Sequence, residues 1–247
     1  FAAGLAIYRV REDGRVEPFA TLLPLVNGQT AVLRDQDAQV FSGLPWFLEE
    51  LRPEGFLGRL LVKASHASLQ LPRDARLWSG EQLLRALAFG VDDLPGDLLV
   101  GADAYHRHLQ RRLAGAEALA RSDYPRRVEA QLAGEPPTSS AGGEQPKFAC
   151  VTTSRGVPEP TLVKYSAPFD ESDAARRWAN LLLCEHLALE ALRAAGIAAA
   201  HSTYIEHDGR AYLELVRFDR SERGRVAVLT GRVVDAEFVG AEAWVPM

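Results

Sequence analysis

A small glycine-containing loop that ends in a lysine is the segment of this sequence best suited to bind phosphate. Residues 139–148 read Ser-Ser-Ala-Gly-Gly-Glu-Gln-Pro-Lys-Phe. The two glycines can adopt positive φ and bring backbone N–H groups close to an anion, while the serine hydroxyls and the lysine ammonium add donors around the same point. An ordinary surface turn has the same composition, so the segments after the loop must decide. The candidate phosphate-binding residues are Ser139, Ser140, Gly142, Gly143 and Lys147.

The segments after this loop have the order strand, strand, helix, strand, strand. Residues 147–152 and 161–165 predict a hairpin, residues 173–195 a long helix followed by Gly196, and residues 202–206 and 211–218 a second hairpin. The N-terminal lobe of a protein kinase needs the same parts. It has a Gly-rich cover over the phosphates, a lysine on a strand, a helix behind the sheet, and a closing strand whose backbone contacts adenine.

Lys164 lies on the second strand of the first predicted hairpin, where its ammonium could neutralise the α- and β-phosphates of a nucleotide. A strand lysine usually just faces solvent. Lys164 is the sole charge in the run Leu-Val-Lys-Tyr, and we therefore favour a binding role. The backbone of Val216, Arg217 and Phe218 could contact adenine, with the Phe218 ring supplying apolar area, although core packing alone would also explain this phenylalanine.

The segments before the loop predict a small sheet with helices packed on it. Residues 5–10, 15–23 and 29–33 have the character of strands, and Asp-Gly and Asn-Gly pairs separate them as hairpin turns do. An amphipathic helix is predicted at 44–51, and after a break at 53–59 a second one runs to about residue 67. A further helix begins after the N-cap Ser79 and ends at Gly90.

An arginine- and alanine-rich helix is predicted at 103–121, with a break near Gly115, and Pro125, Pro136 and Pro137 mark a connector after it. We expect an α+β protein. Its predicted parts are an N-terminal subdomain at 1–100 with a small antiparallel sheet and helices, a helical connector at 101–137, and a protein-kinase-like N-lobe at 138–247 made of a β-hairpin, a long helix and a β-hairpin.

The composition is that of a soluble globular protein. The chain has 247 residues, of which 47% are hydrophobic and 25% charged, and its net charge of -5 indicates no broad basic face for nucleic acid. Cys150 and Cys184 lie in apolar runs and are predicted to be small core residues, which fits a reducing cytoplasm. No apolar run approaches the roughly 20 residues that cross a bilayer, and we expect no membrane partner.

Other common active-site motifs are missing from the sequence. It contains no Gly-x-Ser-x-Gly, His-Glu-x-x-His, Gly-x-Gly-x-x-Gly or Gly-Lys-Ser/Thr motif, so esterase, zinc-peptidase, Rossmann and P-loop functions lack their required parts. The six histidines are scattered, and no metal site is predicted from them.

Several segments resemble the HipA family of bacterial serine/threonine kinases, the toxins of type II toxin–antitoxin modules. The loop at 139–147 is similar to the family's Ser, small, Ala-Gly, small, Gln, any, Lys pattern, with one extra residue between glycine and glutamine. Lys164 matches the family's strand lysine. The run Val-Arg-Phe-Asp-Arg at 216–220 resembles the family's Glu-Arg-Phe-Asp-Arg hinge, residues 180–189 resemble its helix, and residues 44–61 resemble its N-terminal Leu-Pro-Glu-Gly segment.

The resemblance implies an ATP-dependent kinase of protein substrates, with an antitoxin protein as a further partner. It implies that Ser139 or Ser140 is autophosphorylated. It also implies that the catalytic Asp and Asn and the ligands of Mg²⁺ lie beyond Met247, so that this chain is a fragment inactive by itself, preceded before Phe1 by a winged-helix domain. The implied ATP-binding residues are Ser139, Ser140, Ala141, Gly142, Gly143, Gln145, Lys147, Lys164, Val216, Arg217 and Phe218.

Two departures from the family pattern affect this interpretation. Val216 stands where the family has the hinge glutamate, and the helix position of the family's acid falls near Arg177, which leaves Glu185 or Asp173 as candidate partners of Lys164. A second hypothesis is therefore kept beside the kinase. In it the chain is a non-catalytic nucleotide- or partner-binding regulatory module of a toxin–antitoxin or transcriptional system.

Overall fold

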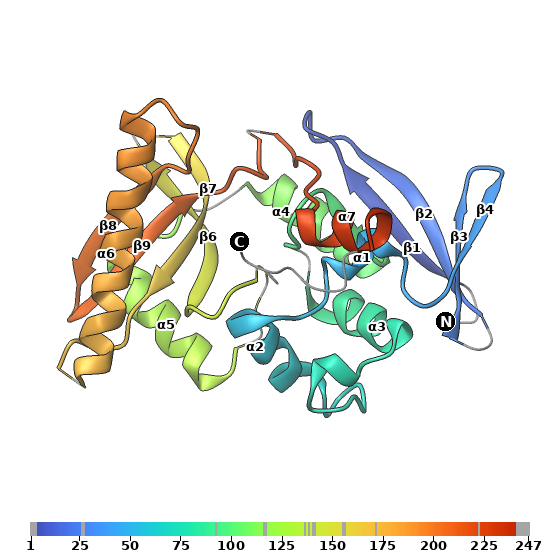
Figure 1. Cartoon of the computed structure of the whole chain (residues 1–247), viewed down its shortest axis with the longest axis horizontal. Coiled ribbons are helices and arrows are strands. Elements are labelled where there is room, and N and C mark those ends of the chain that lie inside the picture. Colours follow the sequence, from blue (N-terminus) through green and yellow to red (C-terminus); the bar gives the residue numbers. More distant parts are fainter. Residues whose placement is uncertain are drawn as a thin grey trace.

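The computed structural model describes residues 4–25, 28–91, 93–115, 118–135, 137, 139, 142–154, 157–170, 172–221 and 223–240. These residues form an α+β protein with two antiparallel sheets, each with its own helices and its own core, as predicted. Figure 1 shows the two sheets at opposite ends of the molecule, with helices between them.

The first sheet has the strand order β4-β3-β2-β1-β5. Its strands are β1 (Leu5–Val10), β2 (Val16–Pro24), β3 (Thr30–Arg34), β4 (Asp37–Phe41) and β5 (Leu98–Val100). The first three were predicted from the sequence. β4 was missed because four of its five residues are exposed and it lacks an apolar alternation. β5 was missed because it has only three residues and pairs with β1 from far along the chain.

Three helices pack on the first sheet: α1 (Trp46–Glu49), α2 (Gly55–Ser65) and α3 (Gly80–Gly90). α3 begins as predicted. The hydroxyl of Ser79 accepts from the Gln82 N–H and the Gln82 side chain accepts from the Ser79 N–H, which is a complete capping box. The apolar faces of these helices and of the sheet form one core that includes Leu22, Leu48 and Leu87.

The predicted helical connector is divided between the two cores. α4 (Ala102–Ala114) ends at Gly115 and packs on β1, β5 and α3 of the first core. A 3-10 turn at Arg121–Asp123 leads into α5 (Tyr124–Ala133), whose buried residues belong to the second core. Pro125, predicted as part of a connector, instead lies in the first turn of α5, where its missing N–H costs no hydrogen bond.

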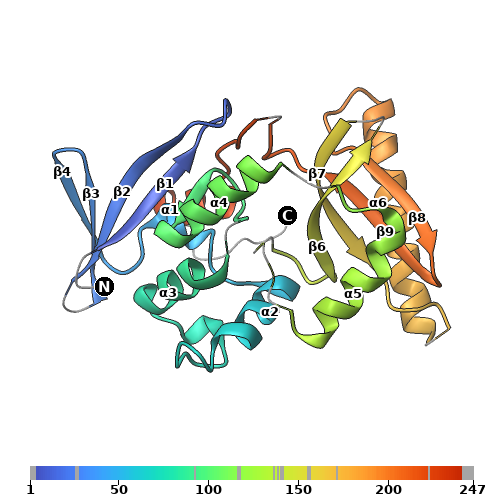
Figure 2. The ribbon, with the colours of Figure 1, turned by 180° about the vertical axis from the view of Figure 1, so that it is seen from behind.

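The second sheet contains the two predicted hairpins, in the order β6-β7-β9-β8. Its strands are β6 (Lys147–Ser154), β7 (Val157–Tyr165), β8 (Ser202–His207) and β9 (Arg210–Val216). α6 (Asp173–Ala194) packs on one face of the sheet and α5 on the other, an arrangement seen from behind in Figure 2. Residues 155 and 156, between β6 and β7, lie outside the described residues.

Only part of the apolar surface of α6 is buried. Leu182 is buried, but the side chains of Trp178, Leu181 and Leu192 are 41%, 52% and 41% exposed. Cys184, predicted as a core residue, is also exposed, because only one side of this helix meets the sheet. None of the helices formed by the described residues is both long and apolar enough to cross a membrane.

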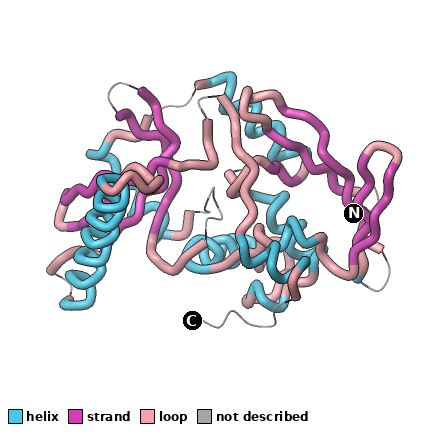
Figure 3. The backbone as a smooth tube through the Cα atoms, turned by 45° about the horizontal axis from the view of Figure 1, so that its top comes forward, coloured by secondary structure: helices cyan, strands magenta, loops and turns pink. Residues whose placement is uncertain are grey.

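The chain returns to the first subdomain after β9, which the sequence did not indicate. Arg225 donates its N–H to the carbonyl of Arg11, and α7 (Gly231–Phe238) packs on α1 through an edge-to-face contact of Phe238 with Trp46. Figure 1 shows this segment leading from β9 to α7, and Figure 3 shows loops between the two sheets of the molecule. The first subdomain is therefore built from two separate stretches of the chain.

Candidate functional site

Lys164 forms an ion pair with Glu185 on the sheet face covered by α6. The ammonium lies 2.6 Å from Oε1 and 2.8 Å from Oε2 of the carboxylate. Both side chains are half-buried. The sequence left Glu185 and Asp173 open as partners of this lysine, and the structure selects Glu185. Asp173 lies instead in the first turn of α6.

Lys147 lies directly beside Lys164, because the two residues are partners in the β6–β7 ladder. Lys147 is 2% exposed, and its ammonium donates to the backbone carbonyls of Gly142 and Gly143. Burial, and then the positive charge of Lys164, lower the pKa of Lys147 to about 8. Lys164 is thus paired with Glu185, whereas the Lys147 ammonium is held by backbone carbonyls and feels the carboxylates of Glu185 and Glu144 at longer range.

The predicted phosphate loop rests on the N-terminus of α2. Phe56 donates its N–H to the carbonyl of Gly143 at 3.0 Å, and Arg59 pairs with Glu144 at 2.6 Å. Gly143 has the positive φ expected of it, +96°, whereas Gly142 is not among the residues with positive φ. The loop is held from two sides, by the Lys147 ammonium and by α2.

The other predicted loop residues differ in how the structure places them. Ser139 is 2% exposed and its backbone bridges to that of Asp93 in the first subdomain. Gln145 is half-buried in the loop itself. Ser140 and Ala141 lie outside the described residues.

The predicted hinge follows β9, but two of its N–H groups are already used. Val216 donates its N–H to His201 and Arg217 donates to Pro160, at 2.9 and 3.0 Å. Phe218 is 78% exposed, so core packing does not explain this ring. An adenine at this edge would therefore have to use hinge backbone groups other than these two N–H groups.

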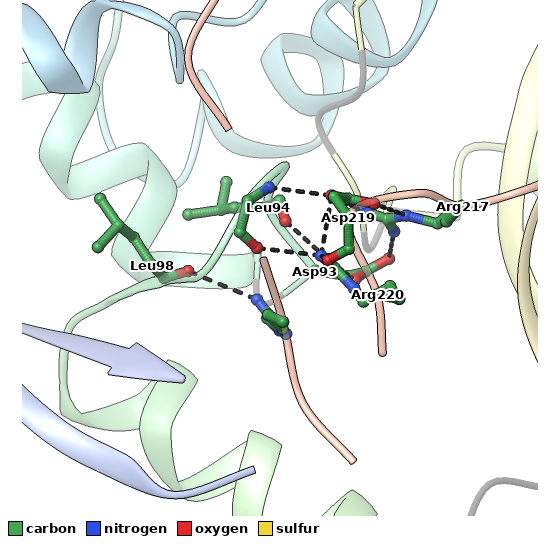
Figure 4. A network of polar contacts seen from close by, with 8 residues as sticks. Asp93, Leu94, Leu98, Arg217, Asp219 and Arg220 are labelled. Carbon is green, nitrogen blue, oxygen red and sulfur yellow. Dashed lines mark hydrogen bonds and ion pairs between the residues drawn. The ribbon is translucent and has the colours of Figure 1, made fainter. Parts of the chain in front are cut away.

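A buried ion network anchors the hinge to the first subdomain, and sequence reasoning missed it. Asp93 pairs with Arg217 at 2.5 Å and with Arg220 at 2.6 Å. Asp219 pairs with the same two guanidinium groups at 2.9 and 2.8 Å, and it accepts the Gly96 N–H at 2.9 Å. Figure 4 shows the two arginines converging on Asp93 and Asp219. No local motif could reveal this contact, because Asp93 is more than 120 residues from the hinge.

The electrostatics of this network favour the charged state of both carboxylates. Burial alone would raise the pKa of Asp93, but the guanidinium groups of Arg217, Arg220 and Arg225 outweigh it and hold this pKa well below its usual range. The pKa of Asp219 is likewise lowered, because the arginine contacts outweigh burial. The hinge is thus fixed by charges that stay ionised at neutral pH.

The opposite face of the second sheet holds another buried polar cluster that the sequence did not predict. Glu214 on β9 is 6% exposed and accepts from Nε and Nη2 of Arg121 at 2.9 and 2.8 Å and from the Tyr124 hydroxyl at 2.6 Å. Burial and this hydrogen bond raise the pKa of Tyr124. The cluster ties α5 to β9 and stabilises the strand that leads into the hinge.

Cys150 offers the site no further chemistry at neutral pH. Burial raises the pKa of Cys150 to about 12, so its thiol is not a nucleophile at neutral pH. The described residues include no group of three or more His, Cys, Asp or Glu side chains placed to hold a metal ion.

Comparisons with known proteins agree with this architecture in both halves of the chain. Residues 2–109 match the family model of the YjjJ-like toxin, middle domain, and residues 139–236 match that of the HipA-like C-terminal domain. The Toxin YjjJ of Escherichia coli (strain K12) is 35% identical over 243 residues, which cover 96% of this chain and 55% of that protein. The chain thus spans about half the length of this curated relative.

Proposed function

Since the chain belongs to the HipA family, with a YjjJ-like middle domain before a HipA-like C-terminal domain, we propose that it forms the ATP-binding part of a toxin that is a serine/threonine protein kinase. The ion pair of Lys164 with Glu185, beside the buried ammonium of Lys147, is the observation that supports this proposal most directly. Active protein kinases use a strand lysine paired with a helix glutamate to hold the ATP phosphates.

The proposed site works by positioning and by neutralising charge. Glu185 fixes the Lys164 ammonium on the sheet, where it can meet the α- and β-phosphates. Lys147 would exchange the carbonyls of Gly142 and Gly143 for phosphate oxygens, which are stronger acceptors for an ammonium. The 139–147 loop would then close over the nucleotide.

Isothermal titration of the chain with ATP tests this site. Lys164→Ala is expected to lower the affinity for ATP at least tenfold, which corresponds to about 1.4 kcal/mol of binding free energy. Glu185→Gln should lower the affinity for ATP by a smaller factor, because the Lys164 ammonium is still present but has lost its ion pair. Lys63→Ala removes an exposed lysine of α2 and is the matched control. Equal affinities for Lys164→Ala and Lys63→Ala would remove Lys164 from the proposed site.

Lys147 offers a second test that does not depend on mutation. Its pKa of about 8 means that near pH 8 it is about half protonated in the free protein. Phosphate oxygens beside the ammonium would raise this pKa, so ATP binding at pH 8 should take up about half a proton. Titrations in buffers with different ionisation enthalpies measure this uptake. An uptake of zero would show that the nucleotide does not reach Lys147.

Phosphoryl transfer requires groups that we place in the part of the relative that this chain does not cover. These are the catalytic Asp and Asn and the ligands of Mg²⁺. We expect this chain alone to bind ATP without transferring phosphate, and the longer protein to act on a protein substrate and to be restrained by an antitoxin. Incorporation of radiolabelled phosphate by this chain, above a control without protein, would contradict that expectation.

Autophosphorylation of the loop at Ser139 or Ser140 is part of the same proposal. Ser139 is buried against the first subdomain and could accept phosphate only after its backbone leaves the bridge to Asp93. The charge of the phosphate would then oppose the binding of ATP at the lysine pair. Mass spectrometry of the longer protein, purified after expression, locates the modified residue. Phosphate found elsewhere and not on this loop would count against the proposal.

A further inference from the structure

A small cavity in the first subdomain lies where the returning segment meets α1. Its volume is about 250 Å³. One wall comes from Trp46 and Phe47 of α1 and from Glu50 directly after that helix, and another comes from residues 227–229 of the returning segment. Residues of β1, β2 and β5, with the segment just before β5, complete the described lining. The cavity is separate from the lysine pair, because none of its described lining belongs to the second sheet.

Three aromatic rings form much of the apolar lining of this cavity. Phe47 lies edge-to-face against Phe19, at 6.0 Å between ring centroids, and against Trp46, at 5.8 Å. Leu51 and Val228 add aliphatic surface. The face of an aromatic ring attracts a cation as well as apolar groups, and tryptophan does so most strongly. This lining favours a ligand with an organic body over a free inorganic ion.

Glu50 gives the cavity a negative charge. Its Oε2 accepts from the hydroxyl of Thr230 at 2.5 Å, so the side chain reaches from the end of α1 to the returning segment that forms the facing wall. Within the described part of the chain the carboxylate has no ion pair, and a hydroxyl donor leaves its charge in place. A carboxylate beside aromatic rings is complementary to a cation.

The other charged groups at this cavity are paired among themselves. Arg9 and Asp97 both line it and form an ion pair with each other. Arg220 donates to the carbonyl of Gly96 in the wall, but its charge is matched by the two carboxylates of the hinge network. Glu50 therefore sets the sign of the charge in the described lining.

We propose that this cavity binds a small organic amine, with its ammonium at Glu50 and its apolar body among Phe19, Trp46 and Phe47. An ammonium carries three donors and no acceptor, which suits a carboxylate and the faces of aromatic rings. The volume is below the roughly 300–1,000 Å³ of pockets for drug-sized ligands, so the ligand is compact, about one ring with a short chain.

The position of the cavity gives such a ligand a structural role. The ligand would contact both α1 and the segment at 227–229, which joins the hinge to α7. Gly96 lines the cavity and donates its N–H to Asp219 of the hinge network. An occupied cavity would hold the returning segment in place and should raise the midpoint of thermal unfolding. Binding here does not depend on a nucleotide at Lys164.

Titration of the whole chain with phenethylamine at neutral pH tests the site, with phenethyl alcohol as an uncharged probe of nearly the same shape. Two-dimensional NMR of the isotopically labelled chain measures both affinities and reports whether the indole N–H signal of Trp46, assigned with Trp46→Phe, shifts. We expect one amine per chain, bound at least tenfold more tightly than the alcohol, with a shift of the Trp46 signal. This comparison needs no variant at Glu50.

Glu50→Gln keeps the size of the side chain and its ability to accept from Thr230. This variant should lower the affinity for the amine at least tenfold and change that for the alcohol less than twofold. Glu129→Gln removes the same charge from an exposed residue of α5 and should change the affinity for the amine less than twofold. Circular dichroism checks the fold of each variant.

Two further variants separate the charge of Glu50 from its hydrogen bond and this cavity from the nucleotide site. Thr230→Val removes the hydrogen bond but leaves the carboxylate, and should change the affinity for the amine less than threefold. Lys164→Ala should leave that affinity unchanged, whatever it does to ATP. The proposal is overturned if the amine does not bind, if it binds no more tightly than the alcohol, or if the Trp46 signal stays in place. It is also overturned if Glu50→Gln behaves like Glu129→Gln, if Thr230→Val reproduces the loss, or if Lys164→Ala abolishes binding of the amine.

Discussion

Replacing Asp93 by asparagine should destabilise the protein more than any similar change at its surface. Asparagine keeps the size of the side chain and removes its charge. In the native structure this carboxylate holds Arg217 at 2.5 Å and Arg220 at 2.6 Å, two side chains that are only 9% and 7% exposed. The variant leaves two buried guanidinium groups sharing the carboxylate of Asp219.

The expected cost follows from this geometry. Breaking a buried ion pair by removing one partner costs about 3–5 kcal/mol. Asp93 is itself 22% exposed, and both arginines keep their contact with Asp219, so the lower end applies. We expect a loss of about 3 kcal/mol in the free energy of unfolding. With a slope of about 3 kcal/mol per molar, the urea midpoint would fall by roughly 1 M.

Urea unfolding followed by circular dichroism measures this loss, with Asp37→Asn as the matched control. Asp37 is an exposed residue at the start of β4 in the first sheet. Its replacement should change the free energy of unfolding by less than about 0.5 kcal/mol. A loss for Asp93→Asn that is no larger than the loss for Asp37→Asn would refute the reasoning that this network anchors the hinge.

The pH dependence of the same variant gives an independent check. Asp93 and Asp219 have folded-state pKa values below the unfolded value of about 3.9. Their stabilisation is therefore complete above that value and is lost as the pH falls below it. The difference in stability between the native protein and Asp93→Asn should be constant near neutral pH and shrink as the pH is lowered from 5 toward 3. A difference that stays constant over this range would contradict the ionised network.

Three further substitutions follow from contacts described above. Gly55→Ala should lower the free energy of unfolding by more than about 1 kcal/mol and also lower the affinity for ATP. The reason is that Gly55 has a φ of +63° and an added Cβ would lie 2.3 Å from the carbonyl oxygen of Gly143 in the loop. Urea unfolding measures the first effect and isothermal titration the second. Tyr124→Phe should cost about 1–2 kcal/mol in urea unfolding by removing one donor from the buried Glu214; an unchanged midpoint would mean that Arg121 alone satisfies that carboxylate. Ser79→Ala should cost about 1 kcal/mol through loss of the α3 cap, and thermal unfolding would show no change if the cap contributes nothing.

The second sheet was the most predictable part of the fold, because its elements are long and carry strong local signals. Two hairpins and a helix of 22 residues follow from alternation, turn residues and the cap positions around α6. The burial of α6 was not predictable in the same way. Its leucines lie on several sides of the helix, and the sequence alone does not say which side the sheet covers.

The candidate site was predictable only where its residues are close in sequence or recur in a motif. Lys147 and Lys164 were candidates from the sequence, but their pairing across one ladder was not predicted and is seen only in the structure. The sequence could not choose between Glu185 and Asp173, since that choice depends on how α6 is rotated against the sheet. The Asp93 network depends on contacts between distant segments and left no local signal.

The return of the chain to the first subdomain has a consequence for the order in which the protein can fold. Residues 118–217 form a continuous stretch that contains the second sheet and its helices, so most of its contacts can form as soon as it is synthesised. The first subdomain is discontinuous, because α7 and the Arg225 segment must arrive from the far end to complete it. The half that emerges first from the ribosome is thus the half that is finished last.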